Sequence, residues 1–292
     1  MKYIKKESKT SFVLSGMKIF WGRYKKNRVA TLGLGIFIVF SIIAILAPYI
    51  SPYDPYRMNL DNTLVAPNSE YLAGTDRFGR DLLSRLIWGT RVSLTIGFVS
   101  AFIATLIGIP TGAISGYYGG RIDYIISRII DIFLVIPRFF LIVLVISVWG
   151  SSIVNVMLII GLMSWTGTAR LIRAEFLSLK EKMYVDAAKS VGTSNLYIIF
   201  IEILPNAIYA AIVNASMQVS GAIMTEASLS FLGLGDPTKV SWGWMLNDAR
   251  KSLRIGWWTS LYPGLLILIV VLAFNVIGDG LNDALNPHLK ER

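Results

Sequence analysis

Long apolar stretches alternate with shorter polar segments along the whole chain. Six of these stretches lie near residues 29–50, 92–114, 127–148, 153–170, 206–228 and 258–278. A helix needs roughly 20 apolar residues to cross a bilayer, and lipid offers the backbone of a crossing segment no hydrogen-bond partners. The pattern therefore predicts an all-α polytopic membrane protein with six transmembrane helices, built as one domain over residues 29–292.

The polar segment over 171–205, between the fourth and fifth stretches, carries a helical pattern of its own. Its apolar residues recur at helical spacing and form a narrow stripe of mostly small side chains: Met183, Ala187, Ala188 and Val191. Gly192 is suited to end this helix, Thr193 or Ser194 to cap the next one, and Pro205 to break the chain before the fifth span. A short helix with a flat face suits a socket in another protein, and an ordinary surface loop is the alternative.

The polar segment over 51–91 is predicted to contain a short amphipathic helix over 77–88. Prolines make the first half of the segment extended, and Gly74 to Asp76 offer a helix start. Such a helix lies at the membrane surface, with Trp88 as an interfacial anchor. We expect it to be either a docking or gating element for something that arrives from outside, or a bracket that packs on the bundle. Its candidate polar residues are Asp76, Arg80, Asp81 and Arg85.

A second outer segment, over 229–257, is also too long for a simple turn. Its tryptophans Trp242 and Trp244 lie where an aromatic belt at the membrane surface is expected. Between these residues and the sixth span, residues 245–254 are compatible with another amphipathic helix. Two such elements on one face are typical of a lid or docking platform, and anchoring by the tryptophans is the simpler explanation.

Charged residues inside the spans are candidates for function because they are costly in lipid. Arg138 follows Pro137 deep in the third span, and Glu226 lies toward the outer end of the fifth. Both are candidates to line a pathway or to form a charge pair between helices, and a structural ion pair is the alternative for each. Asp131 is a further pathway candidate, although it can pair with Arg128 three residues earlier.

The distribution of basic residues predicts the orientation. Residues 1–28 form a basic N-terminal segment with nine lysines and arginines and one acid, which by the positive-inside rule lies in the cytoplasm. With six spans the C-terminus and the 171–205 loop are then cytoplasmic as well. The chain is 54% hydrophobic and 16% charged, with a net charge of +10. We attribute that charge to topology and to contact with anionic membrane lipids, and we expect no nucleic-acid partner.

The composition excludes several kinds of chemistry. The chain has no cysteine and a single histidine, His288, so disulfides, thiolate metal sites, histidine-based zinc sites and Ser-His-Asp triads are absent. It also lacks any Gly-Lys pair, which a P-loop requires. We find no other catalytic constellation and therefore predict no metal site, no bound cofactor and no enzymatic activity in this chain.

The stretch from Tyr184 to Gly192 resembles the cytoplasmic loop of binding-protein-dependent ABC importer permeases. That loop has the pattern Glu-Ala-Ala, three residues, Gly, and later Leu-Pro, which is matched here by Asp186, Ala187, Ala188, Gly192, Leu204 and Pro205. Asp186 replaces the usual glutamate and keeps its charge. Glu202 stands where the family pattern has isoleucine or histidine.

Four further stretches resemble the second, C-type permease subunit of dipeptide, oligopeptide and nickel importers. They are Gly74–Gly89, Glu226–Gly235, Trp242–Leu246 and Gly278–Pro287. Together with the loop they extend over nearly the whole chain after residue 29. The resemblance therefore implies a multi-pass protein of the cell membrane with a type I importer bundle.

The resemblance also implies partners and a mechanism. A homologous second permease would complete the pathway as a heterodimer, and two cytoplasmic ATPase subunits would bind ATP and Mg²⁺. The helix around Asp186 would be the coupling helix, seated in a groove of one ATPase. A solute-binding protein would deliver substrate to the outer segments. Peptides are the substrate that the resemblance favours, with nickel chelates and oligosaccharides as alternatives.

Two other classes of protein remain as alternatives. A self-sufficient secondary transporter or channel would fit six spans, but is expected to show broken helices or coupled charges at mid-membrane. A membrane-embedded enzyme or scaffold would need a catalytic or recruiting constellation.

Overall fold

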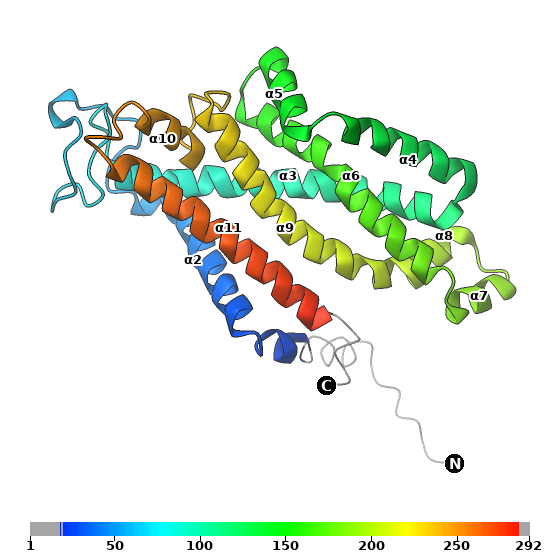
Figure 1. Ribbon diagram of the computed structural model, residues 1–292. Coiled ribbons are helices and arrows are strands. Elements are labelled where there is room, and N and C mark those ends of the chain that lie inside the picture. Colours follow the sequence, from blue (N-terminus) through cyan, green and yellow to red (C-terminus); the bar gives the residue numbers. More distant parts are fainter. Residues whose placement is uncertain (1–17, 19, 286–292) are drawn as a thin grey trace.

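The computed structural model describes residue 18 and residues 20–285, and its regular structure is helical (Figure 1). Outside the described residues lie 1–17, 19 and 286–292. They include much of the basic N-terminal segment and, at the C-terminus, Pro287 and His288. The helices are α2 (Arg28–Ile50), α3 (Leu82–Tyr118), α4 (Gly120–Val135), α5 (Arg138–Trp149), α6 (Ile153–Leu179), α7 (Met183–Ser190), α8 (Asn195–Tyr197), α9 (Leu204–Phe231), α10 (Trp242–Ala249) and α11 (Trp258–Leu285). A π-helical stretch, Ile198–Ile203, joins α8 to α9, and a 3₁₀ turn lies at Leu60–Asn62.

Five helices of the described chain are long and apolar enough to cross a membrane. They are α2, α3, α6, the continuous helix Asn195–Phe231 and α11. A sixth span exists if α4 and α5 are counted together, since this pair passes the same test but is bent by 81°. The third expected span, 127–148, corresponds to this pair, and it is broken at Pro137 rather than continuous. Pro137 favours a non-helical residue before it, and Ile136 is extended with a ψ of 128°.

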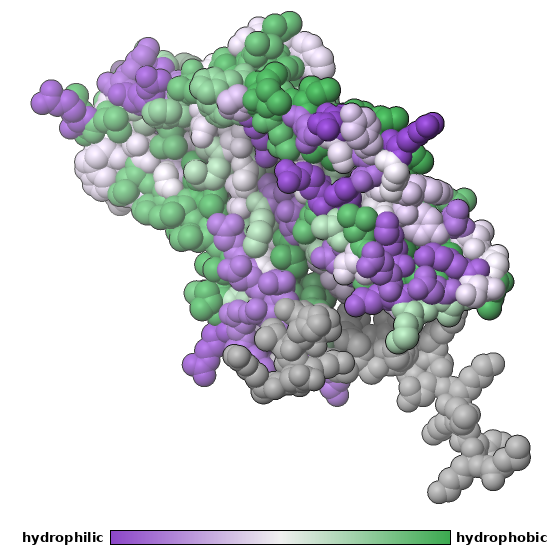
Figure 2. Space-filling view, turned by 45° about the vertical axis from the view of Figure 1, so that its right-hand side comes forward, coloured by the Kyte–Doolittle hydropathy of each residue, from purple (hydrophilic) through white to green (hydrophobic). Residues whose placement is uncertain are grey.

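The long helices lie across one another with α3 at the centre (Figure 1). α3 packs on α6, α9 and α2, while α11 packs on α9 and α2. Large apolar side chains such as Ile45, Phe102 and Leu144 remain exposed on the flanks, at 72%, 65% and 62% of their surface. Figure 2 shows broad hydrophobic areas beside hydrophilic ones on the face it presents, a surface suited to lipid or to a membrane partner.

We name the two ends of the bundle after the orientation that the basic residues predict. The outer end holds the segment over 51–81 and α10, and the inner end holds α7 and α8 (Figure 1). Glycines let α3 and α6 approach closely between these ends. A Cβ atom added to Gly112 would lie 2.4 Å from the carbonyl oxygen of Ala169. Gly108 and Gly116 repeat this close contact one turn away on either side, as in small-xxx-small helix pairs.

The predicted separate amphipathic helix over 77–88 does not exist. α3 begins at Leu82 and continues for 37 residues to the inner end. Asp81 caps it by accepting a hydrogen bond from the Ser84 amide at 2.7 Å, and residues 75–80 before it form a tight loop. The leucines that suggested a surface helix are instead its first buried turns, with Leu82 1% and Leu86 7% exposed.

Two smaller expectations also change. Pro205 does not break the chain, because it lies in the first turn of α9 and the wider π-helical turn just before it accommodates the proline ring. α10 begins at Trp242 rather than Met245, since Ser241 caps it by accepting from the Trp244 amide. Ser194 caps α8, as one of the two predicted capping residues.

Candidate functional site

At the inner end, α7 is held to the bundle by one buried side chain. Val185 is fully buried and packs in a cluster with Ile172 and Phe176 of α6 and with Ile198 and Ile203 of the following helix. This anchor therefore shares one apolar cluster with both α6 and the helix that leads into α9. The sequence analysis did not single out Val185. It lies two positions from both Met183 and Ala187, which places it on the face of α7 opposite to them.

The other face of α7 is exposed and apolar. Met183 and Val191 are 89% and 80% exposed, and Ala187 between them is exposed too. We call Met183, Ala187 and Val191 the α7 stripe. Ala188, which the sequence pattern placed with them, is instead partly buried against the cluster around Val185. An exposed apolar stripe on a helix beyond the membrane-spanning segments is unusual in a chain that acts alone.

The polar residues around α7 shape this surface. Asp186 and Lys189 are exposed and form an ion pair of 3.1 Å with each other. Gly192 ends the helix with a φ of +78°, a conformation that favours glycine, while Thr193 donates its amide to the Ala188 carbonyl. Tyr184 is 39% exposed, Leu204 packs against the Val185 cluster, and Pro205 is exposed.

At the outer end, the four charged residues that the sequence suggested for docking are buried, and all of them except Asp81 belong to one ion network. Asp76, Arg80, Asp81 and Arg85 are 4%, 8%, 4% and 2% exposed. Arg80 donates to Asp76 at 2.6 Å and to Asp248 of α10 at 2.7 Å. Arg85 donates to Asp248 at 3.3 Å, and its Nε lies 3.5 Å from Asp76. A direct contact between these side chains and an incoming protein would require the network to open.

Asp248 is one of the two residues of this network that sequence reasoning missed, the other being Arg77. It also pairs with Arg77 at 3.3 Å, so its carboxylate accepts from three arginines of the outer segment. We call Asp76, Arg77, Arg80, Arg85 and Asp248 the outer brace, because it joins residues 76–85 to α10. Its only signal in the sequence was an acid that stands alone among the basic residues of segment 245–254.

Trp242, expected in a surface belt, is also part of the interior. It is fully buried and donates its indole N–H to the carbonyl of Leu86 at 3.2 Å. Trp244 is partly buried. Trp258 is buried as well, and its indole N–H reaches the Thr75 carbonyl at 3.1 Å. The neighbouring Trp257 is instead largely exposed, at 54%.

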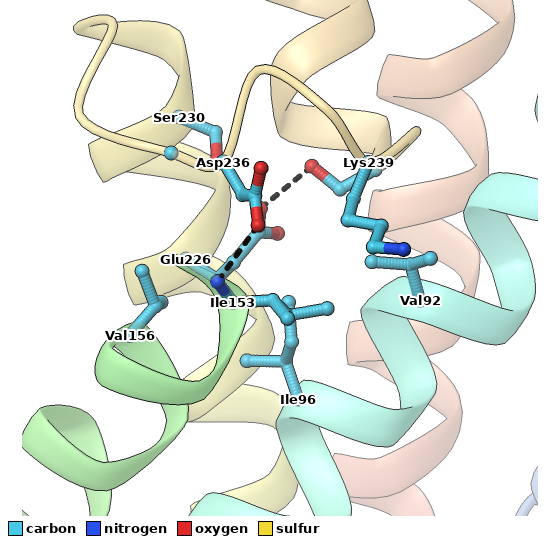
Figure 3. A pocket seen from close by; sticks show the side chains of 10 residues that line it. Val92, Ile96, Ile153, Val156, Glu226, Ser230, Asp236 and Lys239 are labelled. Atoms are coloured by element: carbon cyan, nitrogen blue, oxygen red, sulfur yellow. Dashed lines mark hydrogen bonds between the residues drawn. The ribbon is translucent and has the colours of Figure 1, made fainter. Parts of the chain in front are cut away.

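Glu226 lies in a small pocket between the outer ends of α3, α6 and α9 (Figure 3). It is 2% exposed, and its Oε1 accepts from the hydroxyls of Ser230 and Ser241 at 2.6 and 2.7 Å. Its Oε2 has no hydrogen-bond partner among the described residues. No ion pair of the described chain includes Glu226, so the proposed charge pair is absent and the carboxylate links α9 to the cap of α10 instead.

Asp236 closes the same pocket from the loop above it (Figure 3). It accepts from the Ile153 amide at the start of α6 at 3.0 Å. Burial on its own raises the pKa of Asp236, but hydrogen bonds from Thr238 and Ile153 outweigh burial and lower this pKa below its usual range. The loop between α9 and α10 is thereby tied to α6 by a carboxylate that is ionised at neutral pH.

Arg138 is the first residue of α5, at the bend, and its side chain is exposed. It donates to the hydroxyl of Ser164 in α6, and no acid of the described chain lies within ion-pair distance of it. Asp131 forms the expected pair with Arg128 at 3.4 Å, with both side chains more than half exposed. The structure therefore separates the three pathway candidates into a buried acid, a surface pair and a cation without an acidic partner.

Two family models match the chain. The model described as binding-protein-dependent transport system inner membrane component matches residues 108–291. The model of the N-terminal TM domain of oligopeptide transport permease C matches residues 15–67.

Curated relatives match over nearly the full length. The dipeptide transport system permease protein DppC of Haemophilus influenzae is 44% identical over 279 residues, which cover 93% of this chain and 95% of that protein. The glutathione transport system permease protein GsiD of Pectobacterium atrosepticum is 40% identical, with 93% and 91% covered. The DppC protein of Bacillus subtilis is 38% identical, with 92% and 85% covered.

A solved structure supports the fold. The MetNI methionine ABC transporter in an inward facing conformation contains a chain with a TM-score of 0.58 to this one and 19% identity. The match covers 70% of this chain and 98% of that chain.

Proposed function

Because the chain belongs to the binding-protein-dependent transport system inner membrane component family, as a C-type permease, we propose that it carries di- or oligopeptides into the cytoplasm. Membership makes it a multi-pass membrane permease of an ABC importer, a transport subunit and not an enzyme. The peptide substrate is proposed from the relatives, whose names specify dipeptides and glutathione.

The observation that carries the proposal is the α7 stripe. Ala187 is exposed between the apolar residues Met183 and Val191, and an exposed apolar stripe of this kind is typical of a surface that binds a partner. We propose that a separate ATPase subunit, with its own ATP and Mg²⁺, covers it, and that a second copy of this arrangement lies on a homologous permease in a heterodimer. Asp186 and Lys189 would then flank the contact.

Coupling in this proposal passes through Val185. Because this side chain is buried against both α6 and the helix leading into α9, a displacement of α7 moves the inner ends of two spans together. ATP binding and hydrolysis in the partners would in this way switch the pathway between inward-facing and outward-facing forms. The basic N-terminal segment supports an orientation with α7 in the cytoplasm, beside anionic lipid.

One observation favours the alternative of a self-sufficient transporter. The bend between α4 and α5 is the kind of broken span that secondary transporters use. Purification from the native membrane in mild detergent, with partners identified by mass spectrometry, distinguishes the two. We expect a second permease, ATPase subunits and an extracytoplasmic solute-binding protein, and ATP-driven peptide uptake when the complex is reconstituted. Recovery of the chain alone, with uptake that needs no ATP, would contradict the importer.

Changing Ala187 to arginine is expected to reduce recovery of the ATPase with the permease by about tenfold or more. A socket that accepts a methyl group would have to bury an unpaired guanidinium. The measurement is quantitative co-purification at equal permease yield. The matched control is Leu60→Arg, which is 73% exposed at the outer end and should leave recovery unchanged. Equal recovery with both variants would remove the α7 stripe from the proposal.

A further inference from the structure

One arginine, Arg138, lies near the middle of the membrane thickness. Arg138 donates to the Ser164 hydroxyl. Ser164 lies eleven residues after Ile153, the first residue of α6, or about 17 Å along the helix at 1.5 Å per residue. With α6 spanning the membrane, the Arg138 guanidinium is therefore near mid-depth. The 81° bend that precedes it brings the start of α5 to this level.

No carboxylate of the described chain neutralises Arg138. Asp131, the nearest acid along the sequence, pairs with Arg128. Glu226, the buried acid of the spans, is held by Ser230 and Ser241 near the outer end. An unpaired guanidinium is costly among lipid tails, so its exposed side chain is expected to face water or a partner rather than lipid.

Neutral polar side chains continue from Arg138 across α6 to α9. Ser164 and Thr168 lie one turn apart on the same face of α6. The Thr168 hydroxyl oxygen accepts from the side-chain amides of Asn214 at 3.0 Å and Gln218 at 2.5 Å, both partly buried on α9. We call Arg138, Ser164, Thr168, Asn214 and Gln218 the mid-depth track. It joins three helices and carries one positive charge.

From this arrangement we propose that Arg138 binds the carboxylate of the solute during its passage. The inference rests on the proposed function, since it needs a pathway on the exposed side of α5. A guanidinium has five N–H donors in a planar fork that matches a carboxylate, and the described structure uses one of them, toward Ser164. Because no fixed acid competes for the remaining donors, an incoming carboxylate finds the cation available. The exposure of the side chain also lets the solute leave again, which a buried pair would not.

The test compares variants of the complete, reconstituted importer with its own binding protein, supplied loaded and at saturation. Arg138→Gln removes the charge, Arg138→Lys keeps it, and Arg128→Gln is the control because that arginine lies on the exposed part of α4. We expect Arg138→Gln to slow ATP-driven uptake of dialanine about tenfold or more, as loss of a charge-assisted hydrogen-bonded pair predicts. Arg138→Lys should restore most of the rate, and Arg128→Gln should not change it. ATPase recovery and stimulation by the loaded binding protein should stay the same in all three.

A second measurement detects binding directly and without turnover. Saturation-transfer NMR on the detergent-solubilised permease–ATPase complex, without binding protein, compares dialanine with dialanine amide. Wild type and Arg138→Lys should transfer saturation to dialanine, and Arg138→Gln should lose this signal. Dialanine amide should give little signal with any of them.

The outcomes separate this inference from the function on which it rests. Wild-type uptake of dialanine together with an unchanged rate and signal in Arg138→Gln would overturn the role of Arg138 and leave the importer intact. Equal signals from dialanine and its amide would overturn the role as well. A wild-type complex that transports no peptide would overturn the proposed function and this inference with it.

Discussion

Replacing Asp248 by alanine is expected to lower the free energy of unfolding by on the order of 3–5 kcal/mol, because one partner of a buried ion network is removed. Asp248 accepts from Arg77, Arg80 and Arg85. Arg85 is 2% exposed and would keep only Asp76, with its Nε at 3.5 Å, and the Pro55 carbonyl at 3.2 Å. Arg80 and Arg85, whose side chains are 10% and 2% exposed, would then share a single carboxylate, that of Asp76.

The measurement is thermal unfolding of the detergent-solubilised protein, where we expect the Tm to fall by on the order of 10 °C. Asp131→Ala is the matched control, since it breaks an ion pair of 3.4 Å whose side chains are 63% and 57% exposed. That change should cost about 0–1 kcal/mol. If the two variants unfold at the same Tm, the outer brace contributes no more to stability than a surface ion pair does.

The burial of the outer brace explains why sequence reasoning described the outer end incorrectly. The helical period of 3.6 residues separated an apolar face with the leucines near 82–86 from a polar face with Arg85. The polar face of an amphipathic helix is ordinarily exposed to water. Here the polar face meets α10, because Asp248 lies more than 160 residues away in sequence and brings the compensating charge. Local pattern contains no information on such a partner, so a bracket and a docking element looked alike.

The membrane spans were predictable for the opposite reason. Each span is a local property of about 20 consecutive residues, and lipid imposes helix on all of them. α2, for example, extends from Arg28 to Ile50, within one residue of the expected 29–50. Hydropathy placed the third span but could not give the size of its 81° bend. Pro137 was the available signal, and the full extent of the break depends on how α4 and α5 each pack on α6.

The two ends of the bundle differ in a way that suits a device driven from the inside. At the outer end, the brace, Trp242 and Asp236 tie the segments to α3, α6 and α10 by buried polar contacts. At the inner end, α7 is held by a single buried side chain, Val185, and offers its opposite face to solvent. In the proposed importer, a push on α7 would therefore meet little local resistance and pass to the inner ends of α6 and α9, while the buried outer contacts would keep the outer segments attached to the helices that move.

Such transmission requires α3 and α6 to move as one body, and Gly112→Leu is expected to destroy it together with the fold. One added Cβ would already lie 2.4 Å from the backbone oxygen of Ala169 and 2.9 Å from the Cβ of Ile172. A backbone atom cannot move aside as a flexible side chain can, so the helices must separate along the whole Gly108–Gly116 contact. Overpacking alone costs about 1–3 kcal/mol, and the lost contacts of neighbouring turns add to it.

Gly35→Leu isolates this effect from the intrinsic preference of the helix. Gly35 is also within a helix, α2, but a Cβ there would meet nothing within 4 Å. Leucine favours helix over glycine by about 1 kcal/mol at either site, so propensity alone would stabilise both variants. Size-exclusion chromatography of the solubilised proteins should give a sharp, folded peak for Gly35→Leu and aggregate for Gly112→Leu. Two equally sharp peaks would mean that α3 and α6 can separate without loss of the fold, and α7 could then not move the outer half of the bundle through α6.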